Sequence, residues 1–414
     1  MIFVSRKDWE NNMLREEIVI ESAPVGPLGI LPLKSCQKLG EDINYYISNW
    51  RSNRQSEHKG TLALYGYERD SYIINAENPR FGSGEAKGLI HDSIRGMDLY
   101  ILVDVCNHSL TYSLAGKTNY MSPDDHFQDL KRIIAATGGK ARRISVIMPF
   151  LYESRQHRRT TRESLDCAMG LKELYQMGVD SIITFDAHDP RVINAAPLNG
   201  FENIKPSYQF LKNLCKAEND LKFDKDHLII ISPDEGAMER CVYLASILEV
   251  EMGTFYKRRD YSVVKSGMNP IVAHEYLGPD LNGKDLIIID DMISSGGSML
   301  DTSKALKERG AGRVFIFATF GLFTNGLDKF DKAYEDGWFD RILTTDLTYQ
   351  IPELAEREYF TSVGMSKYIS YMIETLNHDA SISDLLDPSA RIKELIKRYQ
   401  SEEGLSAEQI DNLE

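Results

Sequence analysis

Short aliphatic runs recur along the chain, and each is followed by a turn and then by apolar residues at helical spacing. Leu228–Ile231 precedes such a segment at Met238–Leu248, and Leu286–Ile289 precedes another that Gly310 is placed to end. Unbroken aliphatic runs of this length are typical of parallel strands that are covered on both faces. The pattern therefore predicts strand–helix–strand units, which build a parallel sheet with right-handed crossovers.

The first half of the chain shows the same alternation. Ile144–Met148 and Ser181–Phe185 have the character of buried strands, and Glu163–Met177 between them has helical spacing. A helix is also expected at 39–50 and a strand at 99–105. We therefore expect an α/β protein with two doubly wound parallel-sheet domains.

The expected domain boundaries follow the breaks in this pattern. The domains should join near 205–225, because the charged and poorly periodic segment 216–227 indicates a domain connection or an exposed hairpin. The last expected strand is 342–345. The expected parts are an N-terminal extension at 1–27, a first domain at 28–205, a second domain at 206–350, and C-terminal helices with a charged tail at 351–414.

Composition narrows the class of protein. The 414 residues include 42% hydrophobic and 27% charged residues, which is typical of a soluble globular chain. The formal net charge of −14 argues against nucleic acid as a partner, because neutralising phosphates requires clustered Lys and Arg. Five cysteines without metal-ligand spacing are expected to be reduced thiols. Since there is no apolar signal core and no segment long enough to span a membrane, we expect a cytoplasmic protein.

The stretch from Asp290 to Ser298 gives the clearest indication of a ligand-binding site. Two carboxylates, Asp290 and Asp291, follow a buried strand at the edge where parallel sheets bind ligands. The small-residue loop behind them can wrap backbone N–H groups around a phosphate, and the next helix adds its positive N-terminal end. This loop consists of Ser294, Ser295, Gly296, Gly297 and Ser298. The arrangement suits a sugar phosphate, and the alternative is a strand–turn–helix with two solvated aspartates.

This stretch resembles the phosphoribosyl pyrophosphate loop of phosphoribosyltransferases and of ribose-phosphate pyrophosphokinases. The usual form of that loop is Asp-Asp-Met-Ile-Asp-Thr-Gly-Gly-Thr, and serine stands in this chain for both threonines and for the last aspartate. The resemblance implies that Asp290, Asp291 and the loop 294–298 bind ribose 5-phosphate. It also implies that both domains are of phosphoribosyltransferase type.

Further segments match the ribose-phosphate pyrophosphokinases in order along the chain, and simple phosphoribosyltransferases lack them. The segment Phe81-Gly82-Ser83-Gly84-Glu85 is similar to the family's Phe-Ser-Asp-Gly-Glu, which contacts ATP from a neighbouring subunit. The resemblance implies ATP contacts by Phe81 and Glu85, and hence a homo-oligomer such as a dimer or hexamer. Ser83 occupies the position of the family's aspartate. Without the resemblance, Phe81 would be an ordinary core or interface aromatic.

Three more residue groups resemble the family's ATP and magnesium sites. Arg155 and Gln156 stand where the family's Arg-Gln pair helps to hold ATP. His188 stands where a histidine serves both ATP and Mg²⁺, and Asp234, in Ser-Pro-Asp, stands where an aspartate helps to bind Mg²⁺. Each feature alone has a simpler explanation, because a basic patch is usually solvated and an acid after proline usually forms a turn.

Lys257 and Arg259 are the candidate catalytic residues. The family has Lys-Arg-Arg at this point, at the root of a mobile catalytic loop, and this chain has Lys257-Arg258-Arg259. Fixed cations stabilise the charge that spreads over a transferring phosphoryl group. A basic surface turn is the alternative for these residues alone. The loop that follows, at 261–274, is a candidate for closure over ligands.

The resemblance as a whole implies an ATP- and Mg²⁺-dependent ribose-phosphate pyrophosphokinase. Such an enzyme transfers the pyrophosphoryl group of ATP to the anomeric hydroxyl of ribose 5-phosphate and releases AMP. Two departures keep other functions open: an insertion between Cys106 and His126, expected near the substrates, and an altered segment after His188. The alternatives are an enzyme that acts on a larger ribose-phosphate compound and a non-catalytic relative that binds nucleotides and regulates partners.

Overall fold

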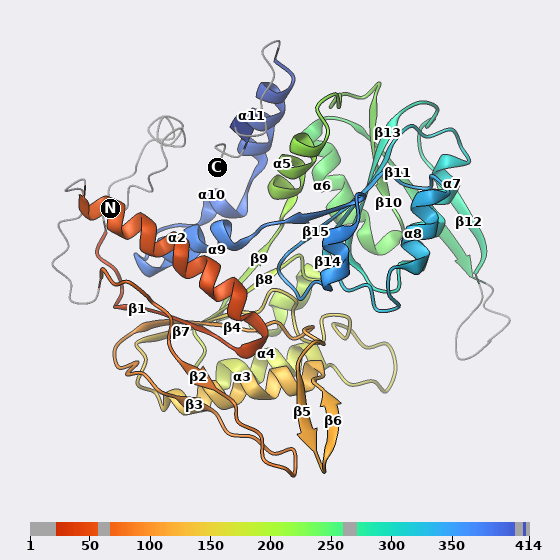
Figure 1. Cartoon of the computed structure of the whole chain (residues 1–414). Helices are drawn as coiled ribbons and strands as arrows, with labels where there is room; N and C mark the ends of the chain where they lie inside the picture. The colour runs from red at the N-terminus through yellow and green to blue at the C-terminus, as the bar shows by residue number, and fades with distance from the viewer. Residues whose placement is uncertain (1–21, 57–66, 260–270, 402–408, 411–414) are drawn as a thin grey trace.

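The computed structural model describes residues 22–56, 67–259, 271–401 and 409–410; for 55–56, 257–259 and 271–274 it describes the backbone alone. Figure 1 shows two α/β domains in contact, each formed by a sheet with helices against it. The predicted fold class, two doubly wound parallel-sheet domains, is confirmed. Among the described residues, no helix is both long and apolar enough to cross a membrane.

The first domain is built on an entirely parallel five-stranded sheet. Its strands lie in the order β1 (Leu28–Pro32), β4 (Asp98–Leu102), β7 (Arg143–Ile147), β8 (Ser181–Phe185) and β9 (Gly200–Ile204). Helix α2 (Gln37–Ser56) lies against one face, and α3 (Pro123–Thr137) and α4 (Asp166–Gln176) cover the other. Because both faces are covered, the strands β1, β4, β7 and β8 are mostly aliphatic and nearly fully buried, whereas the edge strand β9 is only partly buried.

The second domain is built on a seven-stranded sheet. Its strands lie in the order β12 (Ile271–Leu277), β11 (Glu251–Arg259), β10 (Leu228–Ser232), β13 (Asp285–Ile293), β14 (Val314–Gly321), β15 (Arg341–Thr345) and β16 (Phe360–Val363). All neighbours are parallel except β11 and β12, which form an antiparallel edge. β11, which follows β10 in the chain, lies on one side of β10, and β13 lies on its other side. The strand order therefore reverses between β10 and β13, which is where sheets of this kind bind ligands.

Helices cover both faces of the second sheet, and the residues of β13 alternate between the two sides. Ile287 and Ile289 pack into a core that contains α5 (Ser207–Ala217) and α6 (Met238–Leu248) and that continues into the first domain. Leu286 and Ile288 pack with α7 (Gly297–Lys307) and α8 (Asp328–Glu335). This alternation is the period of two that a strand imposes on its side chains.

The C-terminal helices return to both domains. Helix α9 (Ser366–Asn377) packs on α2, where Trp50 stacks on Tyr371 with ring centroids 4.4 Å apart. Next to this stack, the fully buried Glu374 accepts hydrogen bonds from Arg51, with 2.8 Å between Nη2 and Oε2. After the short α10 (Ser383–Leu386), helix α11 (Ser389–Tyr399) packs on α5 and α6.

Several expected elements differ from the structure. β16 follows β15, so 342–345 is not the last strand. Residues 207–217, within the expected domain connection, form α5 and bury Phe210 and Leu211. The segment 216–227 contains the end of α5 and a loop, not a hairpin. The loop expected at 261–274 ends earlier because β12 begins at Ile271; its residues 261–270 lie outside the described residues, as do 1–21 of the expected N-terminal extension.

The insertion after Cys106 forms a hairpin that projects from the first domain (Figure 1). Its strands are β5 (Thr111–Leu114) and β6 (Lys117–Tyr120). The hairpin packs on the loop between β2 (Ala76–Glu77) and β3 (Leu89–Ile90), where the N–H of Ala115 donates to the carbonyl of Gly82 at 3.0 Å. In the described part of the chain its hydrogen bonds and ring contacts are with first-domain residues, whereas the phosphate loop belongs to the second domain.

Candidate active site

The phosphate loop lies where the strand order of the second sheet reverses. Asp290, Met292 and Ile293 still pair with β14, so β13 is longer than predicted and the two aspartates lie within its carboxyl-terminal end rather than beyond it. The loop then turns at once into α7, which begins at Gly297. The carboxylates and the positive end of α7 therefore meet at one edge of the sheet, as a sugar phosphate requires.

The two glycines of the loop have different roles. Gly296 has φ of +79°, in the left-handed region, and an alanine Cβ there would overlap the ring of Phe330. Gly297 has ordinary helical geometry, and a Cβ there would meet nothing within 4 Å. The fold therefore requires glycine at Gly296, whereas Gly297 leaves open space at the start of the helix.

The two aspartates have opposite electrostatic environments. Burial and the charge of Asp291 raise the pKa of Asp290 well above its usual value. Burial alone would also raise the pKa of Asp291, but its hydrogen bond with His188 and the charge of Arg240 lower that pKa below its usual value. The neighbours of the two carboxylates therefore shift their pKa values in opposite directions.

Two of the expected ATP-binding residues of the first domain, His188 and Arg155, lie at this same edge. His188 follows β8, and its Nδ1 atom lies 2.7 Å from Oδ2 of Asp291. The guanidinium of Arg155 donates to the sulfur of Met292, the residue after Asp291. Gln156 donates from Nε2 to the carbonyl of Ser164 at 3.2 Å, within its own loop. The structure thus brings His188 and Arg155 to the acidic end of β13.

Asp234 follows β10, the strand next to β13. Its Oδ1 accepts a hydrogen bond from the N–H of Gly236 at 3.0 Å and caps the short 3₁₀ helix Glu235–Ala237, which is the turn-forming role of the simpler interpretation. Its charge also reaches Asp290 and raises the pKa of that residue. The residues with defined side chains contain no group of three or more His, Cys, Asp or Glu arranged around a metal position. A metal held by His188 and Asp234 would therefore draw its other ligands from substrate and water.

The structure describes only the backbone of Lys257 and Arg259. Both belong to β11, which pairs with β10 on one side and with β12 on the other, and the register shifts between Arg258 and Arg259. Their side chains lie outside the described residues. The catalytic role of the two cations stays a prediction.

Phe81 and Glu85 lie in the first domain, in the loop on which the hairpin packs. The Phe81 side chain is 54% exposed, and Glu85 accepts a hydrogen bond from Ser83 at 2.9 Å. Among the described residues, the hydrogen bonds of this loop are made within the first domain, and the phosphate loop belongs to the second domain. Their expected contact with the ATP of a neighbouring subunit stays a prediction.

Two residues at the site, Arg240 and Thr319, carry no sequence signal of their own. Arg240 on α6 reaches Asp186, with 3.2 Å between Nε and Oδ1, and Thr319 donates to Oδ2 of Asp186 at 2.8 Å. Arg240 is one cation on an amphipathic helix, and Thr319 is one hydroxyl in a buried strand. Only the packing of one domain on the other brings them to Asp186.

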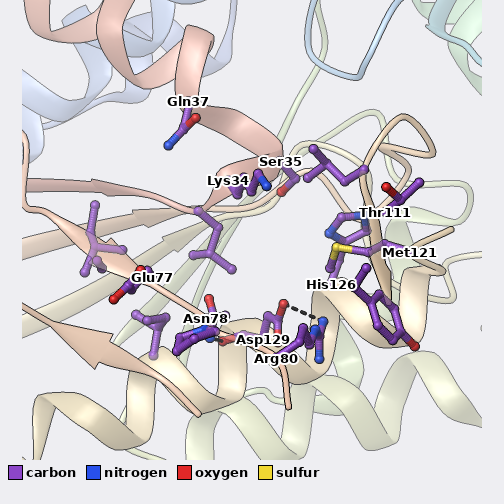
Figure 2. A pocket seen from close by; sticks show the side chains of 17 residues that line it. Lys34, Ser35, Gln37, Glu77, Asn78, Arg80, Thr111, Met121, His126 and Asp129 are labelled. Carbon is purple, nitrogen blue, oxygen red and sulfur yellow. Dashed lines mark hydrogen bonds and ion pairs between the residues drawn. The ribbon is translucent and has the colours of Figure 1, made fainter. Parts of the chain in front are cut away.

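A separate cavity of about 440 Å³ lies in the first domain between the end of β1, the base of the hairpin and α3. Figure 2 shows Arg80 and Asp129 joined at its floor, where Arg80 lies 2.7 Å from Oδ2 of Asp129. Asp129 also pairs with Arg132, and His126 is bound to the carbonyl of Asn107 at 2.7 Å. None of the candidate site residues lines this cavity, and its buried Asp129 and His126 already have hydrogen-bond partners.

Comparisons with known proteins agree with this geometry. Residues 28–178 match the family model of the N-terminal domain of ribose phosphate pyrophosphokinase, and residues 200–343 match that of the phosphoribosyl transferase domain. The chain is 28% identical to the ribose-phosphate pyrophosphokinase of Vibrio parahaemolyticus over 317 residues, which is 76% of this chain and 91% of the relative. It is 28% identical to that of Shewanella oneidensis over 307 residues, 73% and 88% of the two chains.

A solved structure supports the fold. The phosphoribosylpyrophosphate synthetase from Mycobacterium smegmatis superposes with a TM-score of 0.64 at 18% identity, covering 85% of this chain and 99% of that one. The two family models lie in the expected order and together cover most of the chain, with the phosphate loop inside the second. The chain therefore belongs to the ribose-phosphate pyrophosphokinase family.

Proposed function

We propose that this protein is an ATP- and Mg²⁺-dependent ribose-phosphate pyrophosphokinase that acts in the cytoplasm. The observation that carries the proposal is the 2.7 Å contact between His188 and Asp291. It joins the ATP-side residues of one domain to the sugar-phosphate edge of the other in a single site. The relatives from Vibrio parahaemolyticus and Shewanella oneidensis, which align with this chain over 91% and 88% of their own length, carry the name of this activity.

Ribose 5-phosphate would bind at the end of β13. The loop 294–298 and the first turn of α7 supply backbone N–H groups for the 5-phosphate, and the open space at Gly297 allows that phosphate to approach the backbone. Asp290 and Asp291 would accept hydrogen bonds from the ribose hydroxyls. Arg155, Gln156 and His188 would hold ATP on the opposite side of the site.

The donor set fits a magnesium ion. A metal-binding imidazole usually has its other ring nitrogen bound to a carboxylate, and Nδ1 of His188 is bound to Asp291 in this way. Asp234, after the neighbouring strand, offers a carboxylate, and Mg²⁺ commonly takes one or two carboxylates together with substrate phosphates and water. When bound, magnesium neutralises charge on the ATP phosphates.

In the proposed reaction the anomeric hydroxyl of ribose 5-phosphate attacks the β-phosphorus of ATP. A new bond forms from the anomeric oxygen to the β-phosphorus, and the hydroxyl proton is released to solvent. The bond from the β-phosphorus to the oxygen that it shares with the α-phosphorus breaks, so AMP leaves with that bridging oxygen. Lys257 and Arg259 would stabilise the charge that develops on the transferred group. Phe81 and Glu85 of a second copy would contact the nucleotide, so the active form is expected to be a homo-oligomer.

The test is to incubate purified protein with ATP, Mg²⁺ and ribose 5-phosphate and to measure AMP and phosphoribosyl pyrophosphate together. We expect both products in equal amounts, and neither product when ribose 5-phosphate is omitted. Release of ADP instead of AMP would overturn the proposal, as would an absence of both products. In the second case, ATP binding without turnover would point to a larger ribosyl phosphate or to a regulatory relative.

A further inference from the structure

A single arginine lies among the acidic groups where the two domains meet. Arg240 belongs to α6, and its side chain is only 11% exposed. Its Nε atom donates to Oδ1 of Asp186 at 3.2 Å, and its Nη1 atom lies 3.7 Å from Oδ1 of Asp290. One guanidinium therefore joins a carboxylate of the first domain to one of the second.

Asp186 is held tightly from the second domain. It directly follows β8 and has φ of +38°, which residues other than glycine rarely adopt. Its two carboxylate oxygens are both bound by second-domain side chains, Oδ1 by Arg240 and Oδ2 by Thr319 at 2.8 Å. Two residues further along, His188 bonds to Asp291. The short segment Asp186–His188 thus makes three side-chain contacts with the other domain, and one of them is with Arg240.

The positive charge of Arg240 acts on all three aspartates of this contact, Asp186, Asp290 and Asp291. Burial raises the pKa of Asp186, and Arg240 is the largest influence that opposes this rise. The same guanidinium also lowers the pKa of Asp290 and of Asp291. Beside it lies a cavity of about 20 Å³, lined by Asp186, Arg240 and Thr319 among others, which has room for about one water molecule. The domains are therefore closely packed around Arg240.

We propose that Arg240 is a positioning residue of the reaction, which sets the distance between the ribose-binding Asp290 and the ATP-side segment Asp186–His188. The proposal rests on the proposed function for its chemistry, because it assigns ribose to one side of Arg240 and ATP to the other. Arg240 does not itself touch the reacting atoms in this scheme. Its loss would leave each substrate a binding site and would disturb the alignment of the two sites.

The test compares Arg240→Met and Arg240→Lys with Arg313→Met. Arg313 is a matched control, because it pairs with Asp285 at the opposite end of the same strand, β13, with 2.7 Å between Nη2 and Oδ2. We expect Arg240→Met to lower kcat on the order of 100-fold, since a misalignment of about 1 Å costs that much. KM for ATP and for ribose 5-phosphate should change less than about fivefold, and Arg240→Lys should restore part of kcat because it keeps a positive charge. Arg313→Met should leave kcat within about twofold.

A second measurement does not depend on turnover. Hydrogen exchange of the wild-type protein and of each variant is followed at 183–189 and at 287–293. We expect Arg240→Met to speed exchange in both segments together, and Arg313→Met to leave 183–189 unchanged. Unchanged exchange at 183–189 in Arg240→Met would overturn the proposal, and so would an effect confined to KM or an equal loss of kcat in Arg313→Met. A wild-type protein without turnover would remove the proposed function, and the exchange result would still decide whether Arg240 couples the domains.

Discussion

The Nδ1 atom of His188 lies 2.7 Å from Oδ2 of Asp291, although the two residues are 103 positions apart in the chain and belong to different domains. One residue follows the strand that ends in the proposed ATP site, and the other lies beside the phosphate loop. Neither domain alone contains both halves of the site. The proposed reaction therefore requires the two domains to be correctly placed relative to each other. Substitutions at the His188–Asp291 contact should lower activity more than substitutions elsewhere in the same strands.

Asp291→Asn should therefore lower activity strongly. The substitution removes the negative charge that faces His188 and leaves the strand intact, so we expect kcat/KM for ribose 5-phosphate to fall on the order of 100-fold. The matched control is Asp285→Asn at the other end of β13, where the carboxylate pairs with Arg313. The measurement is the rate of AMP release at varied ribose 5-phosphate. Equal losses in the two variants would contradict a role specific to the site.

Gly296→Ala and Gly297→Ala should differ in stability. Gly296 has φ of +79° and its added methyl group would overlap Phe330, so the substitution strains the backbone and overpacks the core. We expect it to destabilise the protein by about 1 to 3 kcal/mol. Gly297→Ala should leave the unfolding midpoint nearly unchanged, because its methyl group meets open space.

The same pair separates folding from phosphate binding. If Gly297 borders the 5-phosphate, Gly297→Ala should raise KM for ribose 5-phosphate while the protein stays as stable as the wild type. Thermal unfolding and steady-state kinetics on both variants provide the two readouts. A Gly297→Ala protein with unchanged KM would mean that the phosphate does not approach this end of α7.

Much of the fold follows from the sequence, because buried parallel strands require aliphatic runs. β10 and β13 were recognisable from Leu228–Ile231 and Leu286–Ile289. β16 was missed because Phe-Thr-Ser-Val at 360–363 is short and polar at its centre, and only its place beside β15 makes it a strand. α5 is not among the expected helices, although Tyr208, Leu211 and Cys215 have helical spacing, because the segment runs directly into the charged stretch 216–227.

The site, like the fold, can be predicted from the sequence only in part. The phosphate loop, Asp234 and His188 stand in local motifs, so the sequence alone predicts them. Arg240 and Thr319 meet Asp186 across the domain contact, and no spacing in the sequence encodes that distance. The different environments of Asp290 and Asp291 also depend on which neighbour each carboxylate meets in three dimensions.

Lys257→Ala should reduce turnover much more than binding. If the ammonium stabilises charge that develops only during transfer, kcat should fall by about two to three orders of magnitude, and KM for ribose 5-phosphate should change little. Lys222→Ala is the control, because Lys222 is an exposed lysine in the loop before β10. The measurement is the initial rate of AMP formation at saturating ATP. An unchanged kcat would remove Lys257 from the mechanism.

Glu374→Ala should destabilise the protein severely. Glu374 and Arg51 have fully buried side chains, and Arg51 donates to both carboxylate oxygens. Removing one partner leaves a buried charge without compensation, which costs about 3 to 5 kcal/mol. Asp42→Ala on the same helix α2 breaks the exposed pair with Lys38 and should cost only a small fraction of that. Urea unfolding measures both, and similar midpoints for the two variants would show that the contact between α2 and α9 contributes little.

Asp104 should give the stability of the protein a distinctive pH dependence. This buried residue follows β4, and its carboxylate accepts hydrogen bonds from the N–H groups of Cys106 at 2.8 Å and Tyr349 at 2.7 Å, so it also connects the two domains. Burial raises its pKa to about 7, although both hydrogen bonds oppose the rise. The usual pKa in an unfolded chain is about 3.9. Between these values the folded protein binds the proton and the unfolded chain does not.

The sign of the effect follows from that difference. The folded state binds more protons than the unfolded state between these two pKa values. The stabilising contribution of Asp104 to the free energy of unfolding is therefore fully present below about pH 4 and is lost as the pH rises through about 7. Asp104→Asn cannot titrate and should lack this decline. Urea unfolding of both proteins at pH 5, 6, 7 and 8, compared as the difference between them at each pH, isolates the contribution from all other groups. We expect the wild type to lose stability relative to the variant from pH 5 to pH 8; a constant difference would show that Asp104 is ionised throughout this range and that its two backbone hydrogen bonds outweigh its burial.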